Sequence, residues 1–374
     1  MIDSLTRRSI GGRPGVDRKI RVMVVDDSVV IRRLITRVLE EDREIEVVGT
    51  AANGVLALQK MEELLPDILT LDIEMPEMDG LETLVHLRQS YPKVRVIMFS
   101  TLTERGAQAT IDSLMRGAND YVTKPSNAGQ IEESMSRLRN ILLPKIKQFY
   151  LHGETKIPER PAIAANLPEK AARPFIPAKP RSKPFRVLAI GVSTGGPTAL
   201  GEVLPEIPAD FPLPIIIVQH MPPLFTQFLA DRLNSRSKIR VVEASQQMIV
   251  EAGTAYIAPG DYHMRFEQRE GQIRIVLDQG PSENSCRPAV DVMLRSAAEV
   301  FQGDILVTIL TGMGQDGRLG AELVKSLGGY VIAQDSESSV VWGMPGAVVE
   351  AGLADMVVSL KSVAQSIVRQ VGKA

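Results

Sequence analysis

Three acidic residues near the start of the chain have the types and positions that metal and phosphate chemistry needs. Asp26 and Asp27 end one apolar run, Asp72 ends another, and Ser100 and Lys124 follow two more. If these runs are parallel strands, their carboxyl ends meet at one edge. Carboxylates that meet there repel unless a cation such as Mg²⁺ joins them, and that ion also binds phosphoryl oxygens. The pattern therefore predicts an acid pocket where the lysine and the serine hydroxyl contact a phosphoryl group.

A serine in a glycine-rich turn is the candidate nucleophile of the second half. Ser193 lies in GVSTGG, between an apolar run and a helical pattern. A sharp turn with free N–H groups at a helix start exposes a serine in this way. The serine needs a base, and two histidines are candidates. His220 ends the apolar run PIIIVQH and His263 lies in PGDYHM, and the residues alone leave the choice open.

The segment TGMGQDG supplies a candidate acid. Asp316 would orient an imidazole and stabilise its cation, and the backbone around Met313 would donate hydrogen bonds to an oxyanion. An ordinary α/β-hydrolase has the chain order serine, acid, histidine. No histidine follows Asp316, so the order Ser193, His220, Asp316 indicates a fold other than the α/β-hydrolase that would bring the same three residue types together.

The same segment also satisfies a dinucleotide-binding fingerprint. Gly312, Gly314 and Gly317 spell GxGxxG between a predicted strand and a predicted helix, and Asp335 follows downstream. Two observations oppose this interpretation. Asp316 would place an anion where pyrophosphate binds, and the motif comes late in its domain rather than at the first turn from strand to helix.

Two α/β units must position these residues. In residues 20–143, five apolar runs alternate with helical patterns, which predicts a doubly wound parallel (βα)₅ sheet. A second α/β pattern, with a mostly parallel sheet, covers residues 185–374. Residues 144–184 contain seven prolines from Pro158 to Pro184 and several basic residues, so we predict a semi-rigid linker. Residues 1–19 are expected to form a flexible extension.

The composition excludes several classes of protein. Cys286 is the single cysteine, so neither an intrachain disulfide nor a cysteine-based zinc site can form. With 43 basic and 45 acidic residues the net charge is −2, which does not favour a nucleic-acid partner. No apolar run reaches the length of a membrane span, and the amino terminus does not have the pattern of a secretory signal. We expect a cytoplasmic protein that is not embedded in a membrane.

Residues 20–143 resemble the response-regulator receiver family, through VVDDS, LDIEMPEMDG, FST and YVTKP. The resemblance implies that Asp72 accepts a phosphoryl group from a histidine kinase. It also implies that Asp27 and Asp72 hold Mg²⁺ together with the carbonyl of Glu74, while Asp26 acts through water. Ser100 and Tyr121 would be the switch pair that reorients after phosphorylation.

Residues 185–372 resemble the chemotaxis protein-glutamate methylesterases, through GVSTGG, QHMPP, PGDYH, CRPAVD and TGMGQDG. The resemblance implies a catalytic triad of Ser193, His220 and Asp316, an oxyanion donor at the Met313 N–H, and Thr194 close to the nucleophile. It implies hydrolysis of glutamate methyl esters on methyl-accepting chemotaxis receptors, and deamidation of receptor glutamines, with no cofactor for hydrolysis. The family often has asparagine where Gln315 stands.

Two hypotheses from other classes remain beside the esterase. One is a nucleotide-binding oxidoreductase that uses the glycine-rich turn at 312–317. The other is a regulator whose second half only binds a partner.

Overall fold

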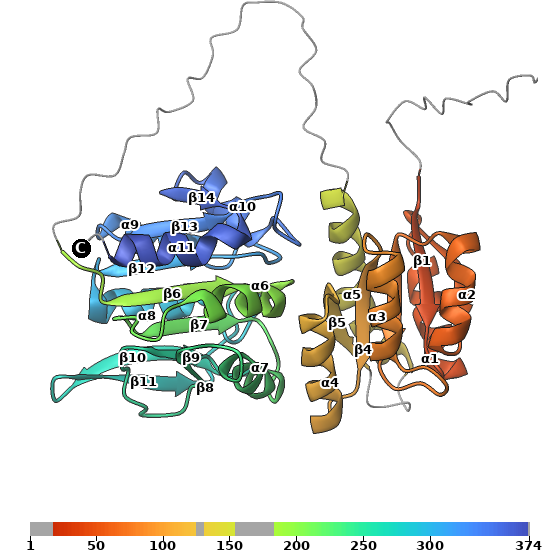
Figure 1. The fold of residues 1–374 in the computed structure, drawn as a ribbon, viewed down its shortest axis with the longest axis horizontal. Helices are drawn as coiled ribbons and strands as arrows, with labels where there is room; N and C mark the ends of the chain where they lie inside the picture. Colours follow the sequence, from red (N-terminus) through yellow and green to blue (C-terminus); the bar gives the residue numbers. More distant parts are fainter. Residues whose placement is uncertain (1–17, 125–130, 154–182, 373–374) are drawn as a thin grey trace, which may run out of the picture.

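The computed structural model describes residues 18–124, 131–153 and 183–372. Figure 1 shows two α/β domains side by side, the N-terminal one red to yellow and the C-terminal one green to blue. Most of the extension expected at residues 1–19, and residues 154–182 of the expected linker, lie outside the described residues.

The N-terminal domain is a doubly wound parallel sheet, as predicted. Its five strands lie in the order β2-β1-β3-β4-β5, and all the pairs are parallel. Helices α1 and α5 share one hydrophobic cluster on one face, while α2, α3 and α4 contribute to the cluster on the other. The elements are β1 (Ile20–Val25), α1 (Val29–Glu40), β2 (Ile45–Ala51), α2 (Gly54–Leu64), β3 (Ile68–Asp72), α3 (Gly80–Ser90), β4 (Arg95–Ser100), α4 (Glu104–Met115), β5 (Asp120–Thr123) and α5 (Ile131–Gly153).

Local sequence explains where these helices begin. The Ser28 side chain accepts a hydrogen bond from the N–H of Ile31 at the start of α1, and Asp79 accepts one from Glu82 at the start of α3. Such caps satisfy N–H groups that have no partner within the helix. Because Ser28 caps α1, the segment between β1 and α1 is short, and Asp26 and Asp27 stay at the edge of the sheet.

Helix α5 corrects the predicted boundary of the linker at residue 144. The helix continues through Pro144 to Gly153. A proline inside a helix removes one backbone hydrogen bond and costs about 3 kcal/mol. Tertiary contacts offset this cost, because Ile146 and Phe149 are buried beyond the proline and Lys145 forms an ion pair with Asp120. Residues 144–153 therefore belong to the N-terminal domain.

The C-terminal domain has a seven-stranded, fully parallel sheet in the order β14-β13-β12-β6-β7-β9-β8, with a separate antiparallel hairpin. This confirms the predicted mostly parallel sheet. The elements are β6 (Val187–Val192), α6 (Gly196–Val203), a 3₁₀ turn (Leu204–Glu206), β7 (Ile215–Gln219), α7 (Phe225–Asn234), β8 (Arg240–Glu243), β9 (Thr254–Ile257), the hairpin β10 (His263–Arg269) and β11 (Gln272–Asp278), α8 (Val290–Phe301), β12 (Ile305–Ile309), α9 (Arg318–Ser326), β13 (Tyr330–Gln334), α10 (Met344–Glu350), β14 (Met356–Val358) and α11 (Leu360–Val371).

Alternation along the strands divides the core of this domain into two layers. In β6, Val187 and Ala189 join the cluster formed with α8 and α9, whereas Leu188 and Ile190 join the cluster with α6, α7 and α11. Successive side chains of a strand point to opposite faces, so a fully apolar strand must be covered on both. Because β6 and β12 are parallel neighbours, the glycine-rich turns that follow them emerge at the same edge of the sheet.

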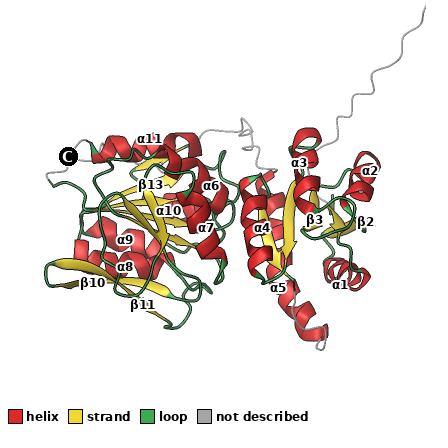
Figure 2. Cartoon of the chain, turned by 60° about the horizontal axis from the view of Figure 1, so that its bottom comes forward, coloured by secondary structure: helices red, strands yellow, loops and turns green. Residues whose placement is uncertain are grey.

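The N-terminal domain packs on that edge through α4 and β5, which face α6 and α7 (Figures 1 and 2). The Thr198 hydroxyl donates to the carbonyl of Leu114 at 2.8 Å. The Tyr121 ring stacks on Phe225 with ring centroids 5.0 Å apart. These contacts join the surface of one domain to the functional edge of the other.

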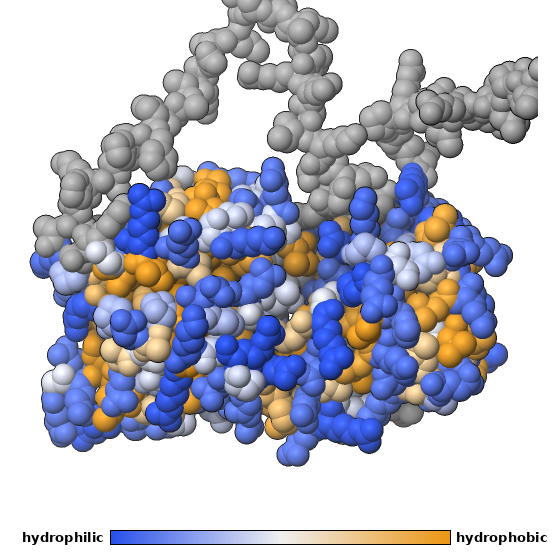
Figure 3. Space-filling model, in the orientation of Figure 1, coloured by the Kyte–Doolittle hydropathy of each residue, from blue (hydrophilic) through white to orange (hydrophobic). Residues whose placement is uncertain are grey.

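The outer surface carries mixed polarity. Hydrophilic side chains cover most of the face shown in Figure 3, with apolar areas between them. Among the described helices, none combines the length and the apolar character that a membrane span requires.

Candidate active site and acid pocket

Ser193 occupies the tight turn that joins β6 to α6. Its carbonyl accepts a hydrogen bond from the N–H of Gly196 at 2.8 Å, and Gly195 between them has φ +77°. This is a type II turn, whose third position favours glycine because φ is positive. A side chain there would also meet Val340, since a Cβ at Gly195 would lie 2.7 Å from that residue. The turn leaves Ser193 partly exposed at the carboxyl end of its strand.

The loop after β12 lies directly against this serine. A Cβ at Gly312 would lie 2.8 Å from the Cβ of Ser193. The Gly312 carbonyl accepts hydrogen bonds from the N–H groups of Gly343 and Met344, which hold the loop in place. Gly312 is therefore explained by its close approach to the serine, without a bound dinucleotide.

The start of α9 opposes the dinucleotide alternative more directly. The N–H of Gly317 donates to the Asp316 carboxylate at 3.0 Å, and the N–H of Gly320 donates to Asp291 at 2.7 Å. In a dinucleotide site, such N–H groups bind the pyrophosphate. Here buried carboxylates already occupy these two donors, so their negative charge lies where the ligand's would.

His220 and Asp316 form a buried pair beside the serine turn. His220 follows β7, and its Nε2 lies 2.8 Å from Oδ2 of Asp316. The side chains are 11% and 2% exposed, so water screens this contact only weakly. Thus the chain brings the predicted acid to the histidine of PIIIVQH.

Asp316 is held by three further donors, which come from two other segments of the chain. Its carboxylate accepts hydrogen bonds from the N–H groups of Val290 and Asp291 at the start of α8, at 2.7 and 3.0 Å. The side-chain amide of Asn284 donates at 2.9 Å. Burial alone would raise the pKa of Asp316, but His220 and the backbone N–H groups of Asp291 and Val290 lower it below the ordinary value. Sequence reasoning missed Asn284, whose position in a loop before α8 carries no periodic signal.

The second ring nitrogen of His220 contacts a thiol. Its Nδ1 lies 3.5 Å from Sγ of Cys286, and no hydrogen bond joins Ser193 Oγ to the imidazole in the described part of the chain. Burial would lower the pKa of His220, but Asp316 and the neighbouring Cys286 raise it to about 9. In apo structures catalytic hydrogen bonds are often long and tighten when substrate binds. Because Asp316 engages Nε2, a proton from Ser193 would have to go to Nδ1, the nitrogen that Cys286 also contacts.

The remaining residues predicted in the second half lie in different positions. His263 is buried on β10, where its Nε2 bonds to the carbonyl of Pro281 at 3.0 Å, and it does not line the cavity beside Ser193. Met313 follows Gly312 and is 39% exposed. Among the described residues, none accepts a hydrogen bond from the Met313 N–H, which leaves that donor free for a ligand. Thr194 adjoins the serine, but its hydroxyl faces the other domain.

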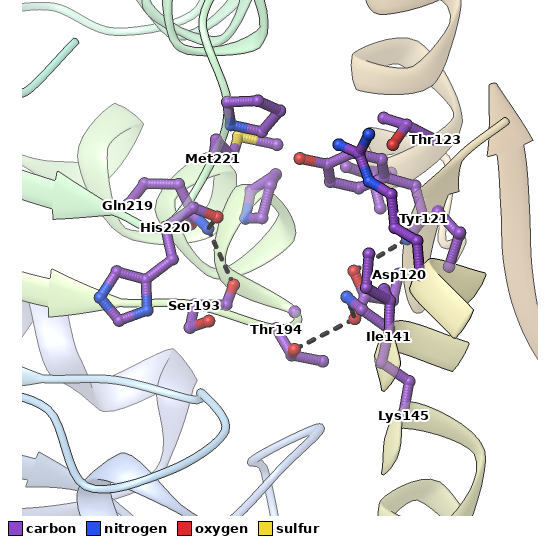
Figure 4. A pocket seen from close by; sticks show the side chains of 16 residues that line it. Asp120, Tyr121, Thr123, Ile141, Lys145, Ser193, Thr194, Gln219, His220 and Met221 are labelled. Carbon is purple, nitrogen blue, oxygen red and sulfur yellow. Dashed lines mark hydrogen bonds and ion pairs between the residues drawn. The ribbon is translucent and has the colours of Figure 1, made fainter. Parts of the chain in front are cut away.

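Both domains line one cavity of about 260 Å³ that contains the serine (Figure 4). Ser193, His220 and Gln219 line it from the C-terminal domain, and Tyr121 and Arg137 line it from the N-terminal domain. At its floor the Thr194 hydroxyl donates to Oδ2 of Asp120 at 3.1 Å. The N-terminal domain therefore forms one wall of the candidate active site.

The predicted acid pocket is present in the N-terminal domain. Carboxylate oxygens of Asp26, Asp27 and Asp72 lie within 4.8 Å of one another. The ammonium of Lys124 lies 2.8 Å from Asp26 and 2.6 Å from Asp72. Burial and the charge of Asp26 raise the pKa of Asp72 to about 6, although Lys124 opposes this shift. The single positive charge of Lys124 therefore cannot neutralise all three carboxylates.

The residues of this pocket fit a magnesium ion. The donor set is all oxygen, two of the three acids are buried, and three carboxylates share the single ammonium of Lys124, so a divalent cation would offset the remaining negative charge. Glu74, whose carbonyl is the third predicted ligand, lines the same pocket as Asp27 and Asp72. The structure therefore supports the predicted Mg²⁺ ligands by proximity and chemistry.

The two residues predicted as a switch pair do not meet in this conformation. The Ser100 hydroxyl donates to the carbonyl of Gly106 at 3.0 Å, within the loop and helix that follow β4. Tyr121 instead stacks on Phe225 of the other domain. In this conformation Ser100 therefore lies at the acid pocket, whereas Tyr121 lies at the domain interface.

Comparison with known proteins agrees with this division into two domains. Residues 22–136 match the family model described as response regulator receiver domain, and residues 188–367 match the CheB methylesterase model. A protein of Trichodesmium erythraeum named protein-glutamate methylesterase/protein-glutamine glutaminase is 48% identical over 95% of this chain and 99% of its own.

Two further relatives carry the same name. The Nocardioides protein is 49% identical over 95% of this chain and 96% of its own, and that of Thermotoga maritima is 41% identical over 95% and 99%. Because these similarities span both domains, the chain belongs to the CheB methylesterase family, the protein-glutamate methylesterases/protein-glutamine glutaminases that carry a response regulator receiver domain.

Proposed function

We propose that this protein hydrolyses methyl esters of glutamate side chains on methyl-accepting chemotaxis receptors, and deamidates receptor glutamines, under control of phosphorylation at Asp72. The observation that carries the proposal is that Ser193 and His220 line one cavity walled by the receiver, with Asp316 bonded to His220 behind it. The names of the relatives, which include both activities, support the substrate class.

Acylation uses the serine as nucleophile. His220 accepts the Ser193 hydroxyl proton at Nδ1 while Oγ bonds to the ester carbonyl carbon. The bond from that carbon to the methoxy oxygen then breaks, and the imidazolium returns the proton to the leaving methanol. Asp316 stabilises the imidazolium through Nε2, at 2.8 Å.

Deacylation repeats the same proton transfers with water. His220 takes a proton from water, the hydroxide bonds to the acyl carbon, and Ser193 leaves with the proton. The product is a glutamate carboxylate. A glutamine substrate forms the same acyl-enzyme with ammonia as the leaving group, so one site serves both activities.

Backbone donors stabilise the tetrahedral intermediate. The Met313 N–H is placed by Gly312, which contacts Ser193, and is free of protein acceptors within the described residues. We assign it as an oxyanion donor, because such donors act where negative charge develops. Thr194, the next residue in the serine turn, ties this turn to the receiver through its hydrogen bond to Asp120.

The receiver controls access to the serine. Mg²⁺ in the acid pocket would neutralise phosphoryl oxygens and orient the phosphoryl group for transfer to Asp72 from a histidine kinase. Lys124 and Ser100 bind the new phosphoryl group, and Lys124 directly follows β5. That strand begins with Asp120 and Tyr121, which contact the C-terminal domain. A rearrangement at Lys124 therefore reaches the domain interface through the short strand β5. Separation of the two domains there exposes the active site to receptors in the cytoplasm.

Methanol release from a methylated receptor fragment tests the proposal. The whole protein should release methanol slowly alone, and faster with Mg²⁺ and a small phosphodonor such as acetyl phosphate. The Asp72→Ala variant should keep the slow rate in both conditions. If no methanol is released under any condition and a serine-directed phosphonate does not label Ser193, the C-terminal domain is a binding module and the proposal is wrong.

A further inference from the structure

A buried glutamine links the strand that carries the nucleophile to the strand that carries the base. Gln219 is 2% exposed and ends β7, whose other side chains are aliphatic. Its amide nitrogen Nε2 donates to the carbonyl of Ser193 at 3.0 Å and to that of His220 at 3.2 Å. Figure 4 shows the side chain beside the serine turn, on the wall of the cavity.

The orientation of this amide follows from its neighbours. Both groups at the nitrogen end are carbonyl oxygens, which only the NH₂ group can satisfy. The oxygen Oε1 then faces the start of α6, where a Cβ on Gly196 would lie 1.9 Å from it. Among the described residues, Oε1 has no hydrogen-bond partner although it is buried.

The two ends of this amide act on the stability of the fold in opposite directions. A buried amide oxygen without a partner is unfavourable, because it has lost its hydrogen bonds to water. A methionine of similar length would fill the same space and remove the unpartnered oxygen, but it would also take away the donor that the Ser193 and His220 carbonyls share. What the glutamine adds over methionine is therefore the hydrogen-bonded connection between the turn of the proposed nucleophile and the residue proposed as base.

The backbone geometry shows what the amide adds. The last register pair between β6 and β7 is Val192 with Gln219, and the His220 N–H bonds to the carbonyl of Val192 at 3.2 Å. Ser193 then turns away into its own loop. The Gln219 side chain donates to the Ser193 carbonyl, and this hydrogen bond joins the two segments one residue beyond the last strand pair.

We infer that Gln219 is a positioning residue for ester hydrolysis, which holds the Ser193 turn in register with His220. The inference rests on the proposed function, because it concerns the transfer of a proton from Ser193 Oγ to His220 Nδ1. These atoms belong to different strands, so their approach depends on the connection between the two turns. A misplacement of about 1 Å between reacting groups costs about a hundredfold in rate.

The test compares Gln219→Met with wild type, as full chains activated by Mg²⁺ and acetyl phosphate. We expect kcat for methanol release to fall about 10- to 100-fold, with KM for the receptor fragment changed less than twofold. Labelling of Ser193 by a serine-directed phosphonate should slow in parallel. The temperature of unfolding should change by only a few degrees, because the loss of two hydrogen bonds and the removal of the unpartnered oxygen act in opposite directions.

A matched control removes a different buried and unpartnered polar atom from the same sheet. Thr308 on β12 has a fully buried hydroxyl without a partner in the described residues, and it bonds neither Ser193 nor His220. Thr308→Val should keep kcat within twofold of wild type. A second variant, Gln219→Glu, keeps the size but turns a carboxylate toward two carbonyls, so it should lose at least as much rate as Gln219→Met.

Three outcomes would overturn the inference. An unchanged kcat in Gln219→Met means that the amide does not position the serine. A Gln219→Met chain that unfolds, or whose loss equals that of Thr308→Val, makes Gln219 structural. If wild type itself releases no methanol, the proposed function fails first, whatever the glutamine does.

Discussion

The carboxylate of Asp120, in the receiver, accepts a hydrogen bond from the hydroxyl of Thr194, the residue next to Ser193. Lys145 of α5 forms an ion pair with the same carboxylate. Asp120 is only 4% exposed, so this contact is shielded from water. The receiver is thus bonded to the turn that carries Ser193, the proposed nucleophile, and it also lines the cavity.

Asp120→Ala should therefore raise the esterase rate of the unphosphorylated protein. A hydrogen bond to a charged group contributes about 1.5–3 kcal/mol, so its loss should favour the open arrangement about tenfold or more. Methanol release without phosphodonor measures the effect. Asp112→Ala is the matched control, because the Asp112–Arg232 pair lies in the same interface with side chains 28% and 42% exposed. The control should change the rate less than twofold; equal effects of the two variants would argue against a specific contact at Asp120.

Removal of the receiver should also activate the enzyme. The deletion should cover residues 1–153, because α5 ends at Gly153. The shortened chain should hydrolyse ester faster than the unphosphorylated whole protein, since the wall formed by Tyr121 and Arg137 is gone. An equal or slower rate would mean that the receiver activates positively instead of blocking access.

The triad is tested by two substitutions. Ser193→Ala should abolish methanol release while the temperature of unfolding stays close to that of wild type. Asp316→Asn should lower kcat by about 10⁴, as expected for an acid that holds the imidazole tautomer and stabilises its cation. Full activity of either variant in a single-turnover assay would remove the triad assignment.

The two candidate histidines are separated by their alanine variants. His220→Ala should be almost inactive, because His220 is the histidine that bonds Asp316 and lines the cavity. His263→Ala should lose less activity, and its cost should fall on stability, because His263 is buried and bonds the Pro281 carbonyl. The base would be wrongly assigned if His263→Ala were inactive and His220→Ala active.

The rate should rise with pH across the neutral range. His220 acts as a base only when neutral, and Asp316 and Cys286 raise its pKa to about 9 against the lowering effect of burial. In the unphosphorylated protein, kcat/KM should therefore increase up to about tenfold per pH unit below pH 9 and then level off. Cys286→Ala should move this rise to lower pH. A profile that falls between pH 7 and 9 would contradict the assignment of His220 as the base.

The local sequence was sufficient for the acid pocket and for the nucleophile turn. Asp27, Asp72 and Lys124 were predicted to meet because each follows a short apolar run in a βα pattern. In a parallel doubly wound sheet, the carboxyl ends of such strands converge whatever the details of packing. The glycines around Ser193 likewise predict a tight turn, since Gly195 has the positive φ that this turn requires. These features depend on residues close in sequence and on one topological rule.

The tertiary structure alone decided which side chains meet across domains and loops. It extended α5 through Pro144, because the burial of Ile146 and Phe149 offsets a lost backbone hydrogen bond. It brought His220 and Asn284 to Asp316 and left His263 away from the cavity beside Ser193. It also set Asp120 against Thr194. Such contacts join residues far apart in the chain, and their free energy comes from complementary surfaces and shared desolvation, which leave no periodic pattern in the sequence.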